Sequence, residues 1–153
     1  MNGFPASQAM AMALEEAAAA GARGEVPVGA VLLGPDGTVL ARAGNRTRER
    51  ADPTAHAEML VIRDACAAVG SERLTGCSLF VTLEPCAMCA AAIAAARVAR
   101  LVFGAEDPKS GGVLHGARVF SHPQAHHVPE VVGGVGEAAA AALLRDFFMR
   151  LRF

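Results

Sequence analysis

Apolar positions along the chain follow two spacings, one helical and one typical of strands. Met10 and Leu14 recur at a helical interval, whereas 26–33 and 78–83 are short apolar or β-branched runs bounded by turn residues. In chain order the pattern predicts a helix over 7–20, strands over 26–33 and 38–43, a helix over 55–69, a strand over 78–83, a helix over 85–96, strands over 100–104 and 128–132, and a helix over 137–152.

Strands that alternate with helices favour an α/β fold. Pro35-Asp36-Gly37 is a turn sequence that joins the first two strands into a hairpin. We therefore expect a three-layer α/β/α sandwich around a central mixed sheet of about five strands, in a single domain over 1–153. The predicted helix boundaries are Ser7, Thr54 and Pro85 at the starts and Gly21 at the first end.

In two segments the apolar residues follow neither a helical nor a strand spacing. Residues 45–52 are polar and rich in arginine, which predicts a loop. Residues 105–127 are rich in Gly, Pro and His, and a loop of this length is usually functional or contains short helices.

The composition limits the classes of function. The chain has 153 residues, of which 53% are hydrophobic and 19% charged, and its net charge of −1 is unlike that of a generic nucleic-acid binder. Arginines nevertheless cluster around the first half and the end of the chain, where they either steer a phosphate backbone or form ordinary solvated surface: Arg42, Arg46, Arg48, Arg50, Arg145, Arg150 and Arg152. No apolar run approaches the ~20 residues of a membrane span, and the N-terminus lacks a signal-peptide pattern, so we expect a cytoplasmic protein with no membrane partner.

Two of the four cysteines form a C-x-x-C motif. Cys86 and Cys89 follow a proline, and together with His56 they offer one imidazole and two thiolates to a single Zn²⁺ per chain. Zinc with three protein ligands keeps a fourth position open, usually for water. Cys66 lies in an apolar helical stretch and Cys77 at the opening of a strand, and both are expected to be inert buried thiols.

Glu58 lies two residues after His56. Two positions along a helix correspond to roughly 200° of rotation, so both side chains cannot easily bind one metal side by side. Glu58 instead suits a proton shuttle beside an open zinc. The alternative is a closed structural Cys2His site that takes a fourth ligand from the later histidines, which are His115, His122, His126 and His127.

The combined pattern H-x-E…P-C-x-x-C is a signature of zinc-dependent nucleobase deaminases. The longer wording is similar to the bacterial tRNA adenosine deaminases, within the cytidine and deoxycytidylate deaminase superfamily. The segments that carry this resemblance are Glu25-Val-Pro-Val-Gly-Ala-Val31, Asn45, Asp52-Pro-Thr-Ala-His-Ala-Glu58, Val81-Thr-Leu-Glu-Pro-Cys-Ala-Met-Cys89, Val102-Phe-Gly-Ala105 and Leu144-Arg-Asp-Phe-Phe148.

The resemblance implies a homodimeric zinc enzyme with a cytidine deaminase-like fold that converts adenosine at the wobble position of a tRNA anticodon stem-loop to inosine. It implies that His56, Cys86 and Cys89 hold zinc and that Glu58 passes a proton to ring N1 and then to the departing amine. The resemblance also implies that Asn45 contacts the flipped base or its ribose, that Val28 and Leu83 form apolar walls, and that Glu25 and Asp107 border the nucleotide. It implies that the N–H of Ala57 and the carbonyl of Glu84 contact the base or leaving amine. Phe147, Phe148 and the terminal arginines would face the anticodon loop.

Two other functions fit parts of the sequence. A free-base or nucleoside deaminase for guanine, cytosine or cytidine shares the zinc ligands, and a closed pocket would favour it over the RNA enzyme. A non-catalytic zinc-binding subunit would not need Glu58. Because the chain has no Trp or Tyr, base stacking would depend on Phe or His.

Overall fold

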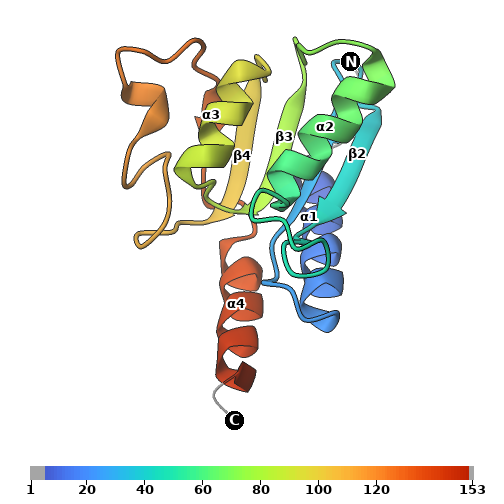
Figure 1. Cartoon of the computed structure of the whole chain (residues 1–153), viewed down its shortest axis with the longest axis vertical. Coiled ribbons are helices and arrows are strands. Elements are labelled where there is room, and N and C mark those ends of the chain that lie inside the picture. Colours follow the sequence, from blue (N-terminus) through green and yellow to red (C-terminus); the bar gives the residue numbers. More distant parts are fainter. Residues whose placement is uncertain (1–5, 152–153) are drawn as a thin grey trace.

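The computed structural model describes residues 6–151 and consists of a five-stranded sheet between two pairs of helices (Figure 1). The elements in chain order are α1 (Ala6–Ala22), β1 (Gly29–Leu33), β2 (Val39–Gly44), α2 (Ala57–Val69), β3 (Ser78–Leu83), α3 (Ala87–Ala95), β4 (Arg100–Ala105), a short 3₁₀ helix (Val119–Ser121), β5 (Glu130–Val132) and α4 (Glu137–Leu151). The predicted three-layer α/β/α sandwich is confirmed.

The sheet is mixed, as the sequence predicts. Its strand order is β2-β1-β3-β4-β5. β1 pairs antiparallel with both β2 and β3, whereas β3, β4 and β5 run parallel to one another. The ends of β2, β3, β4 and β5 and the start of β1 therefore share one edge of the sheet.

The two faces of the sheet are covered by different helices. α1 and α4 pack on one face, and α2 and α3 pack on the other (Figure 1). All five residues of β1 are buried, which is expected for a strand covered on both sides. Val31 and Leu33 pack with α1, whereas Ala30 and Leu32 belong to the core under α2 and α3. No helix within residues 6–151 is long and apolar enough to cross a membrane.

Two helices begin later than the sequence predicts. The N–H and the hydroxyl of Thr54 both donate to Asp52 Oδ1, at 2.8 and 2.7 Å, and form a turn. The N-cap of α2 is His56. Likewise α3 begins after Cys86, not at Pro85. In both cases a predicted first-turn residue occupies the extended position just before the helix.

Smaller differences concern α1 and the strands β1 and β5. Helix α1 continues through Gly21 to Ala22. β1 begins at Gly29 because Pro27 has no N–H and the Val28 N–H turns back to the Val26 carbonyl at 2.8 Å. β5 likewise begins at Glu130, two residues later than predicted.

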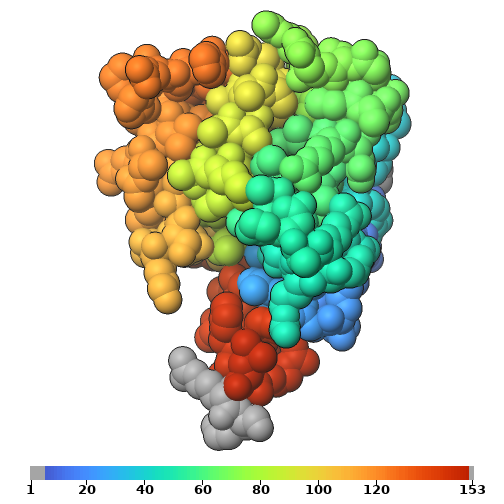
Figure 2. Space-filling model, in the orientation of Figure 1, coloured from blue at the N-terminus to red at the C-terminus, as the bar shows by residue number. Residues whose placement is uncertain are grey.

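Helix α4 begins at the edge of the sheet where β4 and β5 end, and it extends away from the body of the molecule (Figure 1). The space-filling view shows this helix, in red, projecting beyond the other elements, with the 45–52 loop, in blue-green, beside it (Figure 2). The second half of α4 therefore borders the same edge as the starts of α2 and α3.

We expect Gly29→Ala to destabilise the fold. A Cβ at Gly29 would overlap the Ala13 carbonyl oxygen and lie 2.5 Å from the Ala17 nitrogen, both of which are backbone atoms of α1. Relieving this overlap requires α1 to move off the sheet, so the free energy of unfolding should fall by about 3 kcal/mol. Urea unfolding measures the change. Gly34→Ala is the control, because its Cβ would meet the side chain of Asp36 at 3.3 Å and should cost far less.

Candidate active site

Three potential metal ligands converge where α2 and α3 begin. The Nδ1 atom of His56 lies 3.7 Å from Cys86 Sγ and 3.4 Å from Cys89 Sγ. All three ligand atoms lie within 4.8 Å of one another. Residues that are about 30 positions apart in the chain thus form one cluster.

The local backbone explains this convergence. His56 and Cys86 are the N-cap residues of α2 and α3, with extended backbone at φ −71° in each case. An N-cap side chain usually accepts a hydrogen bond from the first turn of its helix, but neither of these side chains does so. Both side chains instead point toward each other, so the two positions serve the cluster rather than helix stability.

The spacing of the donor atoms suits zinc. Tetrahedral zinc with usual Zn–S and Zn–N lengths separates a nitrogen from a sulfur ligand by roughly 3.6 Å. The two observed nitrogen–sulfur distances, 3.7 and 3.4 Å, lie on either side of this value. One imidazole and two thiols are also a common ligand set for a catalytic zinc with an open position.

The protonation equilibria of the three ligands are coupled. The hydrogen bond from the Cys89 thiol, with help from His56, lowers the pKa of Cys86 to about 4. The neighbouring Cys86 sulfur and burial raise the pKa of Cys89. The hydrogen bond with Cys86 also raises the pKa of His56. The cluster thus favours negative charge on the Cys86 sulfur, and the thiolate is the form of cysteine that binds a metal cation.

Glu58 lies in the first turn of α2 and is 3% exposed. Within residues 6–151 its Oε1 atom is the buried side-chain oxygen that has no hydrogen-bond partner. Burial raises the pKa of Glu58 to about 7. A buried carboxylate oxygen without a hydrogen-bond partner is costly for stability, so its retention beside a metal-ligand cluster indicates a chemical role.

The later histidines lie elsewhere. Among residues 6–151 the metal-ligating group contains only His56, Cys86 and Cys89. His115 Nδ1 contacts Glu84, and His127 Nε2 contacts the Val98 carbonyl oxygen at 2.7 Å. The closed four-ligand alternative is therefore not supported, and the cluster fits an open zinc site.

A cavity of about 220 Å³ lies over the cluster. Its lining contains His56, Glu58 and Cys86 together with five of the expected substrate-contact residues, which are Val28, Asn45, Leu83, Glu84 and Asp107. Three further lining residues were not predicted from the sequence, which are Val26, Thr47 and Ser110. Thr47 and Ser110 come from the two aperiodic loops, whose sequences carry no signal of where they fold.

A groove of about 700 Å³ continues from this cavity and shares Val26, Leu83, Asp107 and Ser110 with it. Its far side is α4, including Phe148, whose side chain is 45% exposed. Phe147, expected with Phe148 to face the anticodon loop, is only 6% exposed and packs edge-on against Phe148, so Phe148 presents the larger exposed ring of the two.

The Ala57 N–H, expected to contact a base or leaving amine, donates to Asn45 Oδ1 at 2.8 Å. Ala57 is fully buried. The side chain of Asn45 is thereby fixed at the cavity wall, with its carbonyl oxygen engaged by the first N–H of α2.

Glu25 differs from its expected place at the border of a nucleotide. It is 2% exposed and accepts hydrogen bonds from the N–H groups of Arg48 and Glu49 at 3.1 and 2.8 Å, and from the Thr47 hydroxyl at 3.4 Å. Burial acts to raise the pKa of Glu25, but these hydrogen bonds outweigh it and lower the pKa. Glu25 therefore anchors the 45–52 loop, which contributes Thr47 to the cavity.

Two of the clustered arginines are already paired. Arg42 contacts Glu15 and Glu16 on α1 at 2.9 and 2.7 Å, and Arg46 contacts Glu49 at 2.7 Å. These residues belong to surface ion pairs, which is the ordinary interpretation of an arginine cluster. Arg152, one of the terminal arginines, lies outside the described residues.

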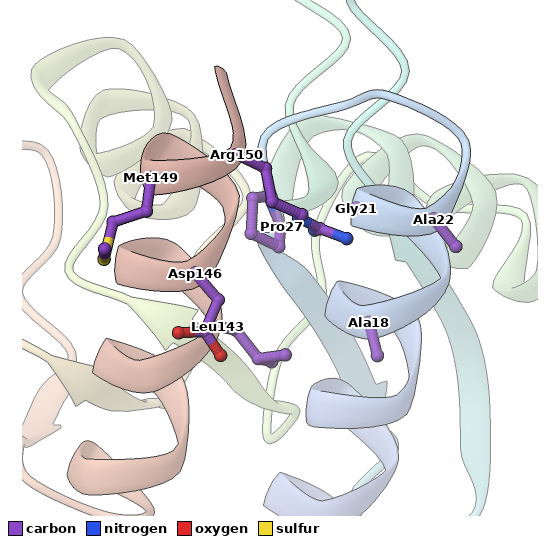
Figure 3. Close-up of a pocket in the computed structure, with 8 residues that line it drawn as sticks. All are labelled: Ala18, Gly21, Ala22, Pro27, Leu143, Asp146, Met149 and Arg150. Carbon is purple, nitrogen blue, oxygen red and sulfur yellow. The ribbon is translucent and has the colours of Figure 1, made fainter. Parts of the chain in front are cut away.

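A separate groove of about 580 Å³ lies between α1 and α4 (Figure 3). Figure 3 shows Arg150 and Met149 of α4 on one side and Ala18, Gly21 and Ala22 of α1 on the other. The groove is larger than the cavity over the cluster, but its lining contains no cysteine or histidine. The chemistry of the lining, rather than size, identifies the 220 Å³ cavity as the candidate active site.

Comparison with known proteins agrees with this assignment. Residues 5–105 match the model of a family described as the cytidine and deoxycytidylate deaminase zinc-binding region. The matched range contains His56, Cys86 and Cys89, so these residues form the zinc-binding group of the chain.

Similar proteins include a tRNA-specific adenosine deaminase of Agrobacterium fabrum (strain C58 / ATCC 33970), which is 59% identical over 94% of this chain and 93% of its own length. A solved structure from a study of A-to-I editing by tRNA:A34 deaminases at the wobble position of transfer RNA has a TM-score of 0.88 and 58% identity, over 90% of this chain and 99% of that one. A guanine deaminase from Nitrosomonas europaea has a TM-score of 0.81 and 25% identity, over 96% and 86% of the two chains.

We expect purified protein to contain one zinc ion per chain, and Cys86→Ser and Cys89→Ser each to lose most of it, because each removes a thiolate ligand. Elemental analysis after dialysis measures the zinc content. Cys66→Ser is the matched control, since Cys66 lies outside the cluster and should leave zinc unchanged. Retention of zinc in both ligand variants would contradict the assignment.

Proposed function

We propose a function from one premise: the chain belongs to the cytidine and deoxycytidylate deaminase family and, within it, to the tRNA-specific adenosine deaminases. Its reaction is the hydrolytic conversion of adenosine to inosine at wobble position 34 of a tRNA anticodon, with release of ammonia. The observation that carries this proposal is the buried Glu58 carboxylate, whose Oε1 has no hydrogen-bond partner, beside an open His/Cys/Cys zinc site in the lining of a small cavity that opens into a groove.

The zinc ion, when bound by His56, Cys86 and Cys89, supplies the Lewis acidity that makes water a nucleophile at neutral pH. Glu58 accepts a proton from the attacking water and delivers it to N1 of adenine. It then carries the second proton, which comes from the new hydroxyl at C6, to the amine at C6. One C–O bond forms and one C–N bond breaks, so water and adenosine give inosine and ammonia. A carboxyl with a pKa raised to about 7 can both accept and donate protons near neutral pH.

The cavity holds a single flipped base. At about 220 Å³ it is smaller than the pockets that enclose whole drug-sized ligands. Val28 and Leu83 form its apolar walls, and the Asn45 amide lies at its rim, where the NH₂ group donates to the base or ribose. The Glu84 carbonyl faces the base or leaving amine. Asp107 accepts from a ribose hydroxyl at the junction with the groove.

The groove favours RNA over a free base as substrate. A free base needs only the small cavity, whereas the neighbouring nucleotides of an anticodon loop need the continuous surface toward α4. Phe148 offers an exposed ring on this surface for base stacking, which is worth about 1–3 kcal/mol per base. Bases in a single-stranded loop are also cheaper to extrude than bases in a duplex.

We also propose that residues 1–153 form one deaminase domain, and that the enzyme is a cytoplasmic homodimer. The family resemblance supports the dimer, and light scattering of the zinc-loaded protein measures its mass in solution.

Glu58→Gln should lower the rate of inosine formation by at least about a hundredfold, because glutamine cannot transfer protons. Zinc content should stay at one per chain, since Glu58 is not a ligand. The assay measures inosine at position 34 under single-turnover conditions. Glu130→Gln, an exposed glutamate on β5, is the control and should leave the rate unchanged. Activity that survives in Glu58→Gln would refute the assigned proton transfer.

The substrate is tested by incubating zinc-loaded protein with a tRNA that carries adenosine at position 34. Parallel reactions contain the same tRNA with guanosine there, and free adenosine, guanine, cytosine or cytidine. We expect inosine only in the tRNA that carries wobble adenosine. Release of ammonia only from a free base or nucleoside would retain the zinc chemistry and replace the RNA substrate with a small molecule.

A further inference from the structure

Glu84 lies between β3 and the zinc ligand Cys86, and its carboxylate is not used by the reaction described above. The residue is 2% exposed. Its side chain accepts five hydrogen bonds, all from the segment 107–115. Only its backbone carbonyl was expected to matter, so the side chain requires a separate explanation.

The two carboxylate oxygens bind different parts of that segment. Oε2 accepts from the N–H groups of Val113, Leu114 and His115 at 3.1, 2.9 and 3.2 Å. Oε1 accepts from the Asp107 N–H at 3.0 Å and lies 2.8 Å from His115 Nδ1. Because a carboxylate can only accept, His115 carries its proton on Nδ1. The segment thus closes around a single negative charge.

The same segment is attached directly to the turn that contains Cys86. The Gly112 N–H donates to the Pro85 carbonyl at 2.7 Å. A Cβ on Gly112 would lie 2.5 Å from the Ala87 nitrogen, and a Cβ on Gly111 would overlap Glu84 Oε2. Two consecutive glycines therefore permit an approach that no other residue allows, and they bring the segment onto the start of α3.

The anchored segment forms one wall of the active site. Asp107 and Ser110 line both the cavity and the groove. Asp107 Oδ1 accepts from the N–H groups of Lys109 and Ser110 at 3.2 and 3.0 Å. Within residues 6–151 its other carboxylate oxygen makes no hydrogen bond, so it is available to a substrate. The position of this oxygen depends on the Asp107 N–H, which Glu84 holds.

We infer that Glu84 and His115 are positioning residues: the buried Glu84 carboxylate, closed from outside by the His115 imidazole, holds 107–115 in place so that Asp107 and Ser110 form the nucleotide wall before substrate arrives. The identity of the substrate rests on the proposed function, whereas the contact between Glu84 and the segment 107–115 does not. Binding then spends no free energy on ordering the loop. His115 is 27% exposed and its Nε2 lies 3.6 Å from Glu106, so it covers the carboxylate on the solvent side.

The first test uses zinc-loaded protein without RNA. In Glu84→Gln an amide NH₂ replaces one accepting oxygen and faces backbone donors. Hydrogen exchange should therefore accelerate roughly tenfold or more at the amides that Glu84 binds, which are those of Asp107, Val113, Leu114 and His115. Zinc content should stay at one per chain. Unchanged exchange at these amides would overturn the inference whatever the substrate of the enzyme is.

The second test replaces His115, the side-chain partner of Glu84, and measures catalysis. His115→Ala should raise KM for the wobble-adenosine tRNA roughly tenfold with little change in kcat, because the loss affects the wall and not the proton transfer. His115→Asn places an amide donor near the position of Nδ1 and should restore KM, whereas His115→Gln places it near Nε2 and should not. His122→Ala, in the same long loop, is the control.

A purely structural role would give a different result. A lower melting temperature in His115→Ala with unchanged KM, or equal behaviour of the Asn and Gln variants, would refute the positioning role. If wild-type protein shows no activity on tRNA, the proposed function fails, and the exchange measurement still decides whether Glu84 holds the segment.

Discussion

The active site depends on one topological constraint, the direction of β3 relative to its two neighbours. β3 is antiparallel to β1 and parallel to β4, so the end of β3 and the start of β1 lie at one edge of the sheet. Helices α2 and α3 both begin at that edge. Their N-cap positions hold His56 and Cys86 instead of capping residues, and Cys89 follows in the first turn of α3. Metal binding thus takes two positions where Ser, Thr, Asp or Asn would have stabilised a helix start by about 1 kcal/mol each.

Three buried glutamates lie around this edge, and their hydrogen bonds decide whether each one holds a loop or transfers protons. Glu25 and Glu84 are buried as deeply as Glu58, but backbone N–H groups surround their carboxylates and lower their pKa values in spite of burial. Burial instead dominates at Glu58, whose Oε1 has no hydrogen-bond partner, and raises its pKa to about 7. The first two hold the loops on either side of the cavity, through Thr47 and Asp107. Glu58 lies between these two loops and is free to exchange protons with the water and the substrate.

The sequence predicted the layers, the strand segments and the zinc ligands because these follow from local periodicity and from short motifs. The helix starts at Thr54 and Pro85 were wrong by two residues. Thr54 is a good N-cap in isolation, but its hydroxyl donates to Asp52 Oδ1 and accepts from Arg63, and the helix begins after His56. The anchoring by Glu84 could not be predicted, because its partners lie 23 to 31 residues away in an aperiodic loop. Phe147 and Phe148 are adjacent identical residues, and only the packing of α4 decides which ring is exposed.

The charges around the groove indicate which contacts a chain with net charge −1 can use to bind an RNA substrate. Arg42 and Arg46 are engaged with glutamates, and the groove contains Glu106 and Asp107 beside Lys109. Phosphate attraction, which dominates the affinity of strongly basic RNA-binding proteins, is therefore weak within the groove. Under the proposed function, recognition depends on fitting one flipped base into a small apolar cavity, on stacking against Phe148, and on a ribose hydroxyl at Asp107. The fit of the base and the ribose contact at Asp107 both require a cavity wall that is already in place. A loop held by a buried carboxylate meets that requirement better than a mobile loop ordered by the RNA, because the ordering cost is then met during folding.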